Sequence, residues 1–195
     1  MPDFSGFVLA GGRSSRMGTD KAFLEFDGRT LLARALDLLH RLTPEARIVG
    51  PAAKFVAYGP VVEDIYTGRG PLAGIHAALS SSATDLNLIL AVDLPLITES
   101  FLQFIVACAR ASDAVVTVPR IAGGYQPLCA VYRRAFWPLA QAALESGRNK
   151  IDALFSAANT RVLEESELGR FAFHAGMFEN LNTPEDLRRA AAKKL

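Results

Sequence analysis

The chain has 195 residues, of which 50% are hydrophobic and 21% are charged. This length and composition predict one soluble globular domain, large enough to bury a substantial core and to leave room for a cleft. The 21 Lys and Arg residues nearly balance the 20 Asp and Glu residues, giving a net charge of +1. The balance excludes a global basic field of the kind that attracts nucleic acid or membranes, so any anion-binding site must be local.

The first predicted element is a buried strand at residues 7–10 that ends abruptly in a Gly-Gly pair. The loop after it carries Arg13, Arg16 and Lys21, and its glycines and serines leave room for a polyphosphate to approach the backbone. It has neither the GxxxxGK[ST] pattern of a Walker A loop nor the GxGxxG of a dinucleotide fold. We therefore expect a nucleoside triphosphate site of another kind. The alternative is a surface turn with tight glycines and solvated cations.

Short apolar runs alternate with helical patterns along the rest of the chain. The predicted strands are 46–49, 86–92, 114–118, 128–132, 160–163 and 171–174, with one or two short extended pieces at 55–62. Six helices are predicted. The first begins after Thr30, the second spans 70 to about 80, and the third begins at Thr98. The fourth spans 134 to about 146, the fifth spans 151–157, and the last begins after Pro184. This alternation predicts a single-domain, three-layer α/β/α sandwich over residues 1–195, with a mostly parallel, Rossmann-like sheet. Strand 86–92 is the most apolar and is expected at the sheet centre.

The cysteines and histidines show no pattern that predicts chemistry. Cys108 and Cys129 belong to no CxxC pair, and we expect buried free thiols instead of metal ligands or a disulfide. His40, His76 and His174 have no ligand spacing, and none is predicted to be catalytic. The N-terminus lacks a signal-type segment and no apolar run has the length of a membrane span, so we expect a cytoplasmic protein.

Asp93 is the acidic residue with the clearest functional interpretation. It directly follows the apolar strand, and Pro95 prevents that strand from continuing. In an open α/β sheet ligands bind beyond the carboxyl ends of the strands, where both Gly11 and Asp93 would emerge. If the two strands are neighbours, Asp93 would hold Mg²⁺ against phosphate oxygens, since Mg²⁺ favours few carboxylates together with waters and phosphates. The alternative is a residue that only stabilises the turn before the helix at Thr98.

Four motifs in order give the chain a family resemblance. The stretch LAGGRSSRMGTDK, residues 9–21, resembles the LAGGxSxRMGxDK signature of the molybdenum cofactor guanylyltransferases, the MobA-like group of the nucleotide-diphospho-sugar transferase superfamily. The resemblance continues through GPLAG at 70–74, AVDLPLI at 91–97 and NLNTPEDL at 180–187, and so spans nearly the whole chain. It implies a nucleotidyltransferase domain of that superfamily's fold.

The resemblance also implies roles for individual residues on the nucleotide side. It assigns backbone contacts with GTP to the glycine-ended strand, phosphate contacts to Lys21 and the metal to Asp93. Asp64 corresponds to a position associated with the nucleotide, although a solvated acid at a strand end is an alternative. The complete set predicted to bind GTP is Leu9, Ala10, Gly11, Gly12, Lys21, Asp64 and Asp93. A further family position is often Asn but is Gly50 here, which weakens the expectation of strict guanine selectivity.

A second substrate is expected on the opposite side of the same crevice. Asn180 and Asn182 have period-two spacing, so on an extended segment both amides project from one face and suit a polar heterocycle such as a pterin. The alternative for Asn182 is a turn that caps the last helix. The resemblance adds Lys150, and the complete set predicted for the pterin substrate is Arg16, Gly18, Lys150, Asn180 and Asn182. The segment 125–127 would shape the pocket without taking part in chemistry.

Together these features predict Mg²⁺-dependent guanylyl transfer. The terminal phosphate of molybdopterin would attack the α-phosphate of GTP, with Arg16 and Lys21 on the phosphates, Asp93 acting through Mg²⁺, and pyrophosphate leaving. The nucleophile is already an anion, so no strong general base is needed. Alternatives are a nucleotidyltransferase that uses CTP with molybdopterin or an NTP with a sugar phosphate, and a non-catalytic nucleotide-binding paralogue. Transient contacts with cofactor-biosynthesis and molybdoenzyme-delivery proteins are expected.

Overall fold

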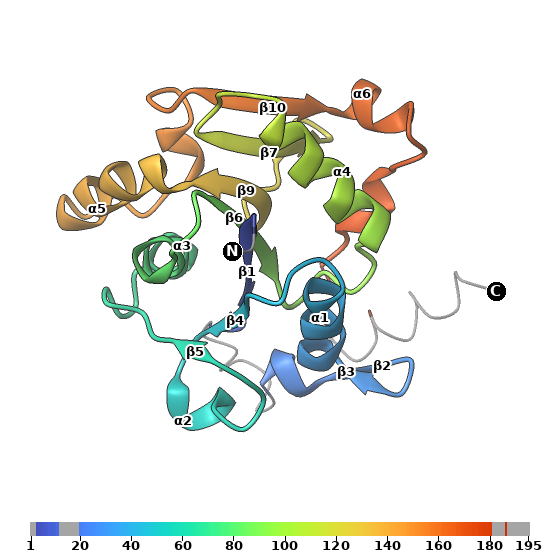
Figure 1. The fold of residues 1–195 in the computed structure, drawn as a ribbon, viewed down its shortest axis with the longest axis vertical. Helices are drawn as coiled ribbons and strands as arrows, with labels where there is room; N and C mark the ends of the chain where they lie inside the picture. The colour runs from blue at the N-terminus through green and yellow to red at the C-terminus, as the bar shows by residue number, and fades with distance from the viewer. Residues whose placement is uncertain (1–2, 12–19, 181–185, 187–195) are drawn as a thin grey trace.

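A computed structural model of the chain describes residues 3–11, 20–180 and 186. Its centre is an eight-stranded sheet, with α1 and α4 on one face and α3 and α5 on the other (Figure 1). The strands of this sheet are β1 (Phe4–Leu9), β4 (Ala46–Val49), β5 (Val61–Val62), β6 (Leu86–Ala91), β7 (Val116–Ile121), β8 (Gly124–Tyr125), β9 (Cys129–Arg133) and β10 (Thr160–Glu164). A separate hairpin consists of β2 (Glu25–Phe26) and β3 (Arg29–Thr30). The expected three-layer α/β fold is confirmed.

The helices vary in length and in how they begin. The α-helices are α1 (Leu31–His40), α2 (Ala52–Phe55), α3 (Pro71–Ser81), α4 (Glu99–Arg110), α5 (Trp137–Glu145) and α6 (Glu165–Gly169). Short 3-10 turns are η1 (Lys21–Phe23), η2 (Arg134–Phe136), η3 (Asp152–Leu154) and η4 (Ala175–Phe178). Thr30 caps α1 and Thr98 caps α4, each accepting a hydrogen bond from the backbone N–H three residues later. Both predicted helix starts are therefore confirmed.

β1 is the strand at which the chain stops adding strands on one side and starts adding them on the other. The order is β10-β7-β9-β6-β1-β4-β5, with β8 paired to β7. From β1 the chain builds β4 and β5 on one side, then crosses to β6 on the other side of β1. All of these pairs are parallel, and Leu9 lies opposite both Val49 and Ala91. The carboxyl ends of β1, β4 and β6 therefore share one edge, which is where open α/β sheets bind ligands.

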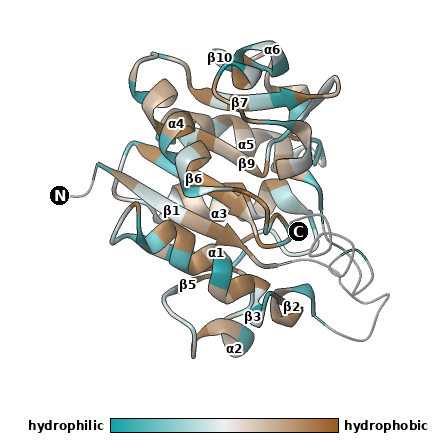
Figure 2. Ribbon diagram, turned by 90° about the vertical axis from the view of Figure 1, so that its right-hand side faces the viewer, coloured by the Kyte–Doolittle hydropathy of each residue, from teal (hydrophilic) through white to brown (hydrophobic). Residues whose placement is uncertain are grey.

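One strand runs against this direction in the middle of the sheet. β9 is antiparallel to both of its neighbours, β6 and β7, whereas β10 is again parallel to β7. The sheet is thus mostly parallel, as expected, and β6 is fully buried near its centre. In Figure 2 helix α1 alternates between hydrophobic and hydrophilic residues, because one side packs on the sheet and the other faces solvent.

Several sequence predictions were wrong in detail. Residues 171–174 form no strand: they follow α6, which the sequence pattern did not reveal, and Ala172 has a φ of +60°, a left-handed conformation that a strand excludes. In segment 55–62, Phe55 ends a short helix and only Val61–Val62 is a strand. The helix predicted at 151–157 is reduced to the 3-10 turn η3. The strand predicted at 114–118 runs from Val116 to Ile121 instead. The helix predicted after Pro184 lies outside the described residues.

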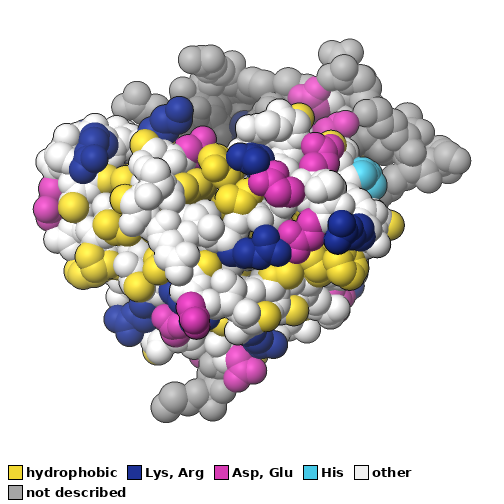
Figure 3. Space-filling view, turned by 90° about the horizontal axis from the view of Figure 1, so that it is seen from above, with side chains coloured by type: hydrophobic (Ala, Val, Ile, Leu, Met, Phe, Trp, Pro, Cys, Tyr) yellow, Lys and Arg dark blue, Asp and Glu magenta, His cyan; other side chains and the backbone are white. Residues whose placement is uncertain are grey.

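The surface carries charges of both signs. Figure 3, seen from the β10 side of the sheet, shows Lys and Arg side chains interspersed with Asp and Glu and with hydrophobic side chains. Arg120 and Glu164, on neighbouring strands there, form an ion pair at 2.6 Å. This mixture agrees with the near-zero net charge of the chain. Within the described residues, no helix combines the length and apolar character that crossing a bilayer requires.

Candidate active site

The segment after β1 is fixed between its two neighbouring strands. The backbone N–H groups of Ala10 and Gly11 both donate to the carbonyl oxygen of Val49, at 3.0 and 3.1 Å. On the other side, the N–H of Val92 donates to the carbonyl oxygen of Leu9 at 3.1 Å. Gly11 and Asp93 therefore emerge from adjacent strands at the same edge, as the sequence predicted.

Lys21 and Asp93 meet at this edge, although 72 positions separate them in the chain. Lys21 Nζ lies 3.5 Å from Asp93 Oδ2, and the two side chains are 32% and 21% exposed. Asp20 caps the 3-10 turn η1 that begins with Lys21, by accepting a hydrogen bond from Ala22 N at 3.2 Å. The other oxygen of Asp20 accepts a hydrogen bond from Lys54 Nζ at 2.9 Å. The aspartate before Lys21 thus orients the turn that presents the lysine, and the site brings together a cation and a carboxylate suited to phosphate and metal.

Asp64 contributes a buried oxygen to the same region. Its Oδ1 is buried and has no hydrogen-bond partner among the described residues. Burial raises the pKa of this carboxyl. A Cβ at Gly74 would lie 3.7 Å from Asp64 Oδ1 and 3.3 Å from Leu9 Cδ2, so the glycine leaves room beside the carboxylate. One carboxylate oxygen of the partly buried Asp64 is therefore shielded from solvent, and this unsatisfied oxygen suits a ligand N–H or O–H.

Gly50 has a structural reason to be glycine. A Cβ at this position would lie 2.8 Å from Phe55 Cε2 and 3.2 Å from the backbone nitrogen of Gly11. Its own N–H donates to the carbonyl oxygen of Val62 at 3.0 Å. Phe55 also contacts Phe23 of η1, with ring centroids 5.9 Å apart. The aromatic ring of Phe55 thus occupies the space that a side chain at position 50 would need, and sequence reasoning did not identify it.

The donor set fits Mg²⁺ only together with a phosphate-bearing substrate. Within the described residues, no group of three or more His, Cys, Asp and Glu side chains lies close enough to hold a metal ion. Asp93 offers one partly exposed carboxylate at the strand end. Mg²⁺ is commonly bound by one or two carboxylates, with waters and substrate phosphates completing the shell. The chemistry of Asp93 is therefore compatible with the expected metal.

The remaining predicted residues divide into two groups. Leu9 and Ala10 are buried, Gly11 is exposed, Lys150 is exposed between α5 and η3, and Asn180 is exposed after η4. Gly12, Arg16, Gly18 and Asn182 lie outside the described residues, so their predicted roles stay predictions.

The cysteines are free thiols, as the sequence predicted, and His76 lies in the core. Cys108 and Cys129 are free thiols, partly and fully buried, and burial raises the pKa of both. His76 lies between Tyr66 and Trp137, with ring centroids 5.1 and 5.6 Å away. These contacts give it a place in the core between α3 and α5.

The described part of the chain contains a mostly parallel sheet with Gly11, Lys21 and Asp93 at the carboxyl edge of its central strands. This arrangement is typical of nucleotide-binding α/β enzymes. Residues 6–162 match the MobA-like NTP transferase domain, and the chain belongs to this family. The resemblance found in the four sequence motifs is thereby confirmed.

Relatives and a solved structure extend the similarity over the whole chain. The molybdenum cofactor guanylyltransferase of Desulfosudis oleivorans is 33% identical, with 98% of this chain and 96% of the relative covered. A probable molybdenum cofactor guanylyltransferase of Pelotomaculum thermopropionicum is 34% identical, with 95% and 91% covered. The crystal structure of molybdopterin-guanine dinucleotide biosynthesis protein A from Archaeoglobus fulgidus superposes with a TM-score of 0.85 at 25% identity, covering 98% of this chain and 100% of that one.

Proposed function

We propose that this protein is a molybdenum cofactor guanylyltransferase, which transfers GMP from GTP to the terminal phosphate of molybdopterin and releases pyrophosphate. Whole-chain similarity to relatives of that name supports this assignment. The observation that carries it is the Lys21–Asp93 pair, 3.5 Å apart at the edge where ligands bind in such sheets. A cation for the phosphates and a carboxylate for a metal are what nucleotidyl transfer requires at one point.

The nucleoside would lie against the segment after β1. The N–H groups of Ala10 and Gly11 are already hydrogen-bonded to Val49, so this segment would contact the base through carbonyl oxygens. Guanine presents N–H donors on its Watson–Crick edge, which suit such acceptors. The buried oxygen of Asp64 would accept a further hydrogen bond from the base or the ribose.

The reaction would proceed by in-line attack on the α-phosphate. The molybdopterin phosphate oxygen forms the new P–O bond, and the bond to the pyrophosphate oxygen breaks. Lys21 would exchange its contact with Asp93 for one with the triphosphate, and Arg16 would add a second positive charge. Asp93 would bind Mg²⁺, which when present neutralises charge on the phosphates. Because the nucleophile is an anion, the residues of the site supply alignment and charge compensation and no general base.

The acceptor side of the proposal depends on residues with less structural support. Lys150 and Asn180 are exposed and accessible to a ligand. With Arg16, Gly18 and Asn182 they are proposed to bind the pterin substrate. We also propose that the protein acts in the cytoplasm, where GTP is available, and contacts proteins that supply molybdopterin or receive the product.

Substrate selection tests the proposal directly. Pyrophosphate release is measured with molybdopterin, Mg²⁺ and each nucleoside triphosphate in turn. We expect turnover with GTP and little with CTP, ATP or UTP. Turnover with CTP alone, or with a sugar phosphate in place of molybdopterin, would assign one of the alternative reactions instead.

Substitution of Asp93 tests whether the site performs the transfer. We expect Asp93→Ala to lower pyrophosphate release at least about a thousandfold, because the metal-binding carboxylate is lost. Asp85→Ala serves as a matched control, since Asp85 precedes the same strand but pairs with Arg133 at the opposite edge. Equal activity of the Asp93 and Asp85 variants would contradict the assignment of this edge as the active site.

A further inference from the structure

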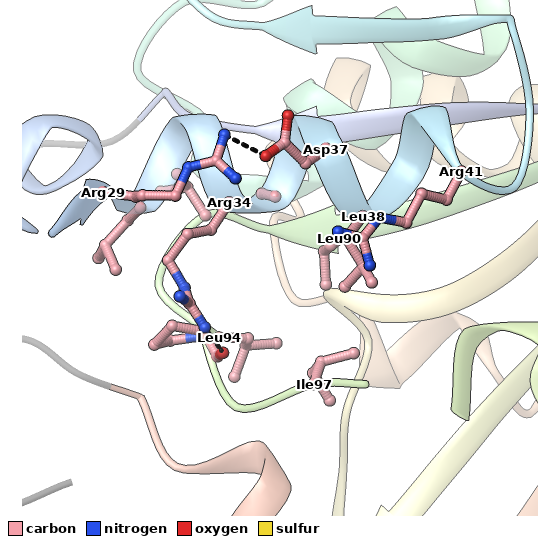
Figure 4. Close-up of a pocket in the computed structure, with 12 residues that line it drawn as sticks. Arg29, Arg34, Asp37, Leu38, Arg41, Leu90, Leu94 and Ile97 are labelled. Carbon is pink, nitrogen blue, oxygen red and sulfur yellow. Dashed lines mark hydrogen bonds and ion pairs between the residues drawn. The ribbon is translucent and has the colours of Figure 1, made fainter. Parts of the chain in front are cut away.

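Arg34 of α1 extends across a cavity toward the loop that follows Asp93. The cavity, of about 160 Å³, lies between α1 and the connection from β6 to α4. Arg34 Nη2 donates a hydrogen bond to the backbone carbonyl oxygen of Pro95 at 3.4 Å. Figure 4 shows the guanidinium directed at this loop, next to Leu94. The loop is thus connected to α1 two residues after the carboxylate of the active site.

The same guanidinium contacts the hairpin that follows Lys21. Its central carbon lies 4.8 Å from the centroid of the Phe26 ring, and Nη1 lies 3.9 Å from Asp27 Oδ2. Asp27 and Gly28 both have positive φ values, +51° and +73°, as a tight two-residue hairpin turn requires. The hairpin therefore has a defined shape and begins two residues after η1.

The Arg34 side chain is largely buried. Only 25% of its side chain is exposed. Its Nε is buried, and no described residue accepts a hydrogen bond from it. Burying a donor without an acceptor is unfavourable, and the contacts with the hairpin and with Pro95 are favourable interactions that act against this cost.

We propose that Arg34 is a positioning residue that fixes Asp93 relative to Lys21. It connects the loop after Asp93 with the hairpin after Lys21, and these two segments closely follow the two partners of the active site. A partly exposed ion pair such as Lys21–Asp93 contributes little to its own geometry, so an external connection is needed to keep the carboxylate and the cation in register. The inference rests on the proposed nucleotide and metal site for its binding measurement, and on the proposed transfer reaction only for its activity measurement.

The test compares two arginines of the same helix. Arg34→Met removes the hydrogen bond and the charge but keeps an unbranched side chain over Phe26. Arg41→Met is the matched control, because Arg41 lines the same cavity and pairs instead with Glu99 at 3.5 Å, at the first residue of α4. Arg34→Lys retains the charge, yet one ammonium group cannot contact Pro95 and the hairpin together. Thermal unfolding is measured for each variant.

The primary measurement is Mn²⁺ binding to the full-length protein with GTP and without molybdopterin, by electron paramagnetic resonance. We expect Arg34→Met to weaken Mn²⁺ affinity about tenfold, as loss of a group that orients a metal ligand does, and Arg34→Lys to give an intermediate value. Arg41→Met should remain within about twofold of the wild type. In turnover with molybdopterin, kcat of Arg34→Met should fall about tenfold while KM for GTP changes less than threefold.

The outcomes separate this inference from the proposed function. If Arg34→Met and Arg41→Met bind Mn²⁺ equally well, or if Arg34→Lys restores full affinity, the positioning role is wrong. If the wild type binds no Mn²⁺ with GTP, the site itself is misplaced and the inference falls with it. If the wild type binds Mn²⁺ and GTP but transfers no GMP to molybdopterin, only the proposed function fails. If a variant of Arg34 unfolds, Asp27→Asn provides a second test, because it weakens the contact of Asp27 with Arg34. It should change Mn²⁺ affinity in the same direction as Arg34→Met, by a smaller factor; an unchanged affinity would contradict the proposal.

Discussion

Asp64 carries a cost that a ligand would remove. The buried oxygen lacks a partner among the described residues, and burial raises the pKa of the carboxyl from its ordinary value of 3.8. The folded state therefore binds the proton more tightly than the unfolded chain does. The stability associated with this group is fully present below pH 3.8 and is lost as the pH rises through the folded pKa. At neutral pH the ionised carboxylate destabilises the folded protein without ligand.

Asp64→Asn should consequently raise the melting temperature of the ligand-free protein at pH 7. The gain should shrink as the pH is lowered toward the ordinary carboxyl value of 3.8, because the carboxyl of the folded wild type takes up its proton above that value. The same substitution should weaken GTP binding about tenfold, because a charged hydrogen-bond acceptor is lost. Differential scanning calorimetry at two pH values and titration calorimetry with GTP measure the two effects. A variant that is less stable at pH 7 and binds GTP normally would show that Asp64 is only structural.

Gly50→Ala should destabilise the protein by about 1–3 kcal/mol, because the added methyl group would overlap the ring of Phe55. Gly59→Ala is a close control, since Gly59 has a similar φ of +151°, against +159° for Gly50, and nothing lies within 4 Å of its added Cβ. The free energies of unfolding of both variants, measured in urea, separate steric overlap with Phe55 from backbone strain, because only the Gly50 variant has the overlap. Phe55→Leu combined with Gly50→Ala should recover part of the loss, and equal stability of the two glycine variants would refute the explanation.

At the scale of elements, α3 and α5 enclose a histidine without hydrogen bonds. His76 is 2% exposed, and both of its ring nitrogens lack partners among the described residues. Burial lowers the pKa of His76 from 6.5, and the carboxylate of Glu145 opposes this effect. Because the folded pKa is below the unfolded one, stability is fully present above pH 6.5 and is lost as the pH falls toward the folded pKa.

His76→Phe should remove this dependence and keep the ring packing with Tyr66 and Trp137. We expect the variant to be at least as stable as the wild type at pH 7.5. Between about pH 6.5 and pH 5 the wild type should lose stability relative to the variant, since only the wild type must accept a proton on unfolding. Melting temperatures over this pH range provide the measurement. If the melting temperatures of the two proteins change in parallel with pH, His76 titrates equally in the folded and unfolded states and the prediction is wrong.

Strands and helices were predictable from the sequence where the local pattern of residue types allowed only one structure. The strand at 86–92 is an apolar run that can only be buried, and it lies near the centre of the sheet as β6. Residues 171–174 instead alternate Phe with other residues, a pattern that also predicts a strand. Phe171 and Phe173 pack against Phe104, with ring centroids 4.6 and 5.3 Å away, and Ala172 between them has a left-handed conformation. Alternation of aromatic and small residues fits either arrangement, and the tertiary contact decides between them.

Within the site, the ends of the strands were predictable and the supporting contacts were not. Asp93 and Gly11 follow apolar runs directly, so their meeting at one edge follows from parallel pairing. Arg34 donates a hydrogen bond to a backbone carbonyl oxygen 61 positions away. The ring of Phe55 occupies the space that a side chain at Gly50 would need. Neither contact leaves a pattern of residue types or spacing, because any residue can offer a carbonyl.

For the whole molecule, the strand order divides the sheet into two blocks along the chain. The block β5-β4-β1-β6, with Lys21, Asp64 and Asp93, is complete by residue 93, whereas β7, β9 and β10 come later. The two blocks meet only where β6 pairs with β9 among the described strands. The residues proposed to bind the nucleotide therefore come from the first half of the sequence, whereas those proposed to bind the acceptor come from both halves.

The antiparallel strand β9 has a consequence for the protein during its synthesis. Until residues 129–133 leave the ribosome, the apolar strand β6 has one edge without a partner, and exposed apolar edges invite pairing with other chains. The chain makes α4 in this interval, and α4 covers one face of the sheet but not the edge. The nascent chain thus passes through a stage in which the residues proposed to bind GTP have all been made while β6 still has an open edge, and β9 ends that stage by closing the edge.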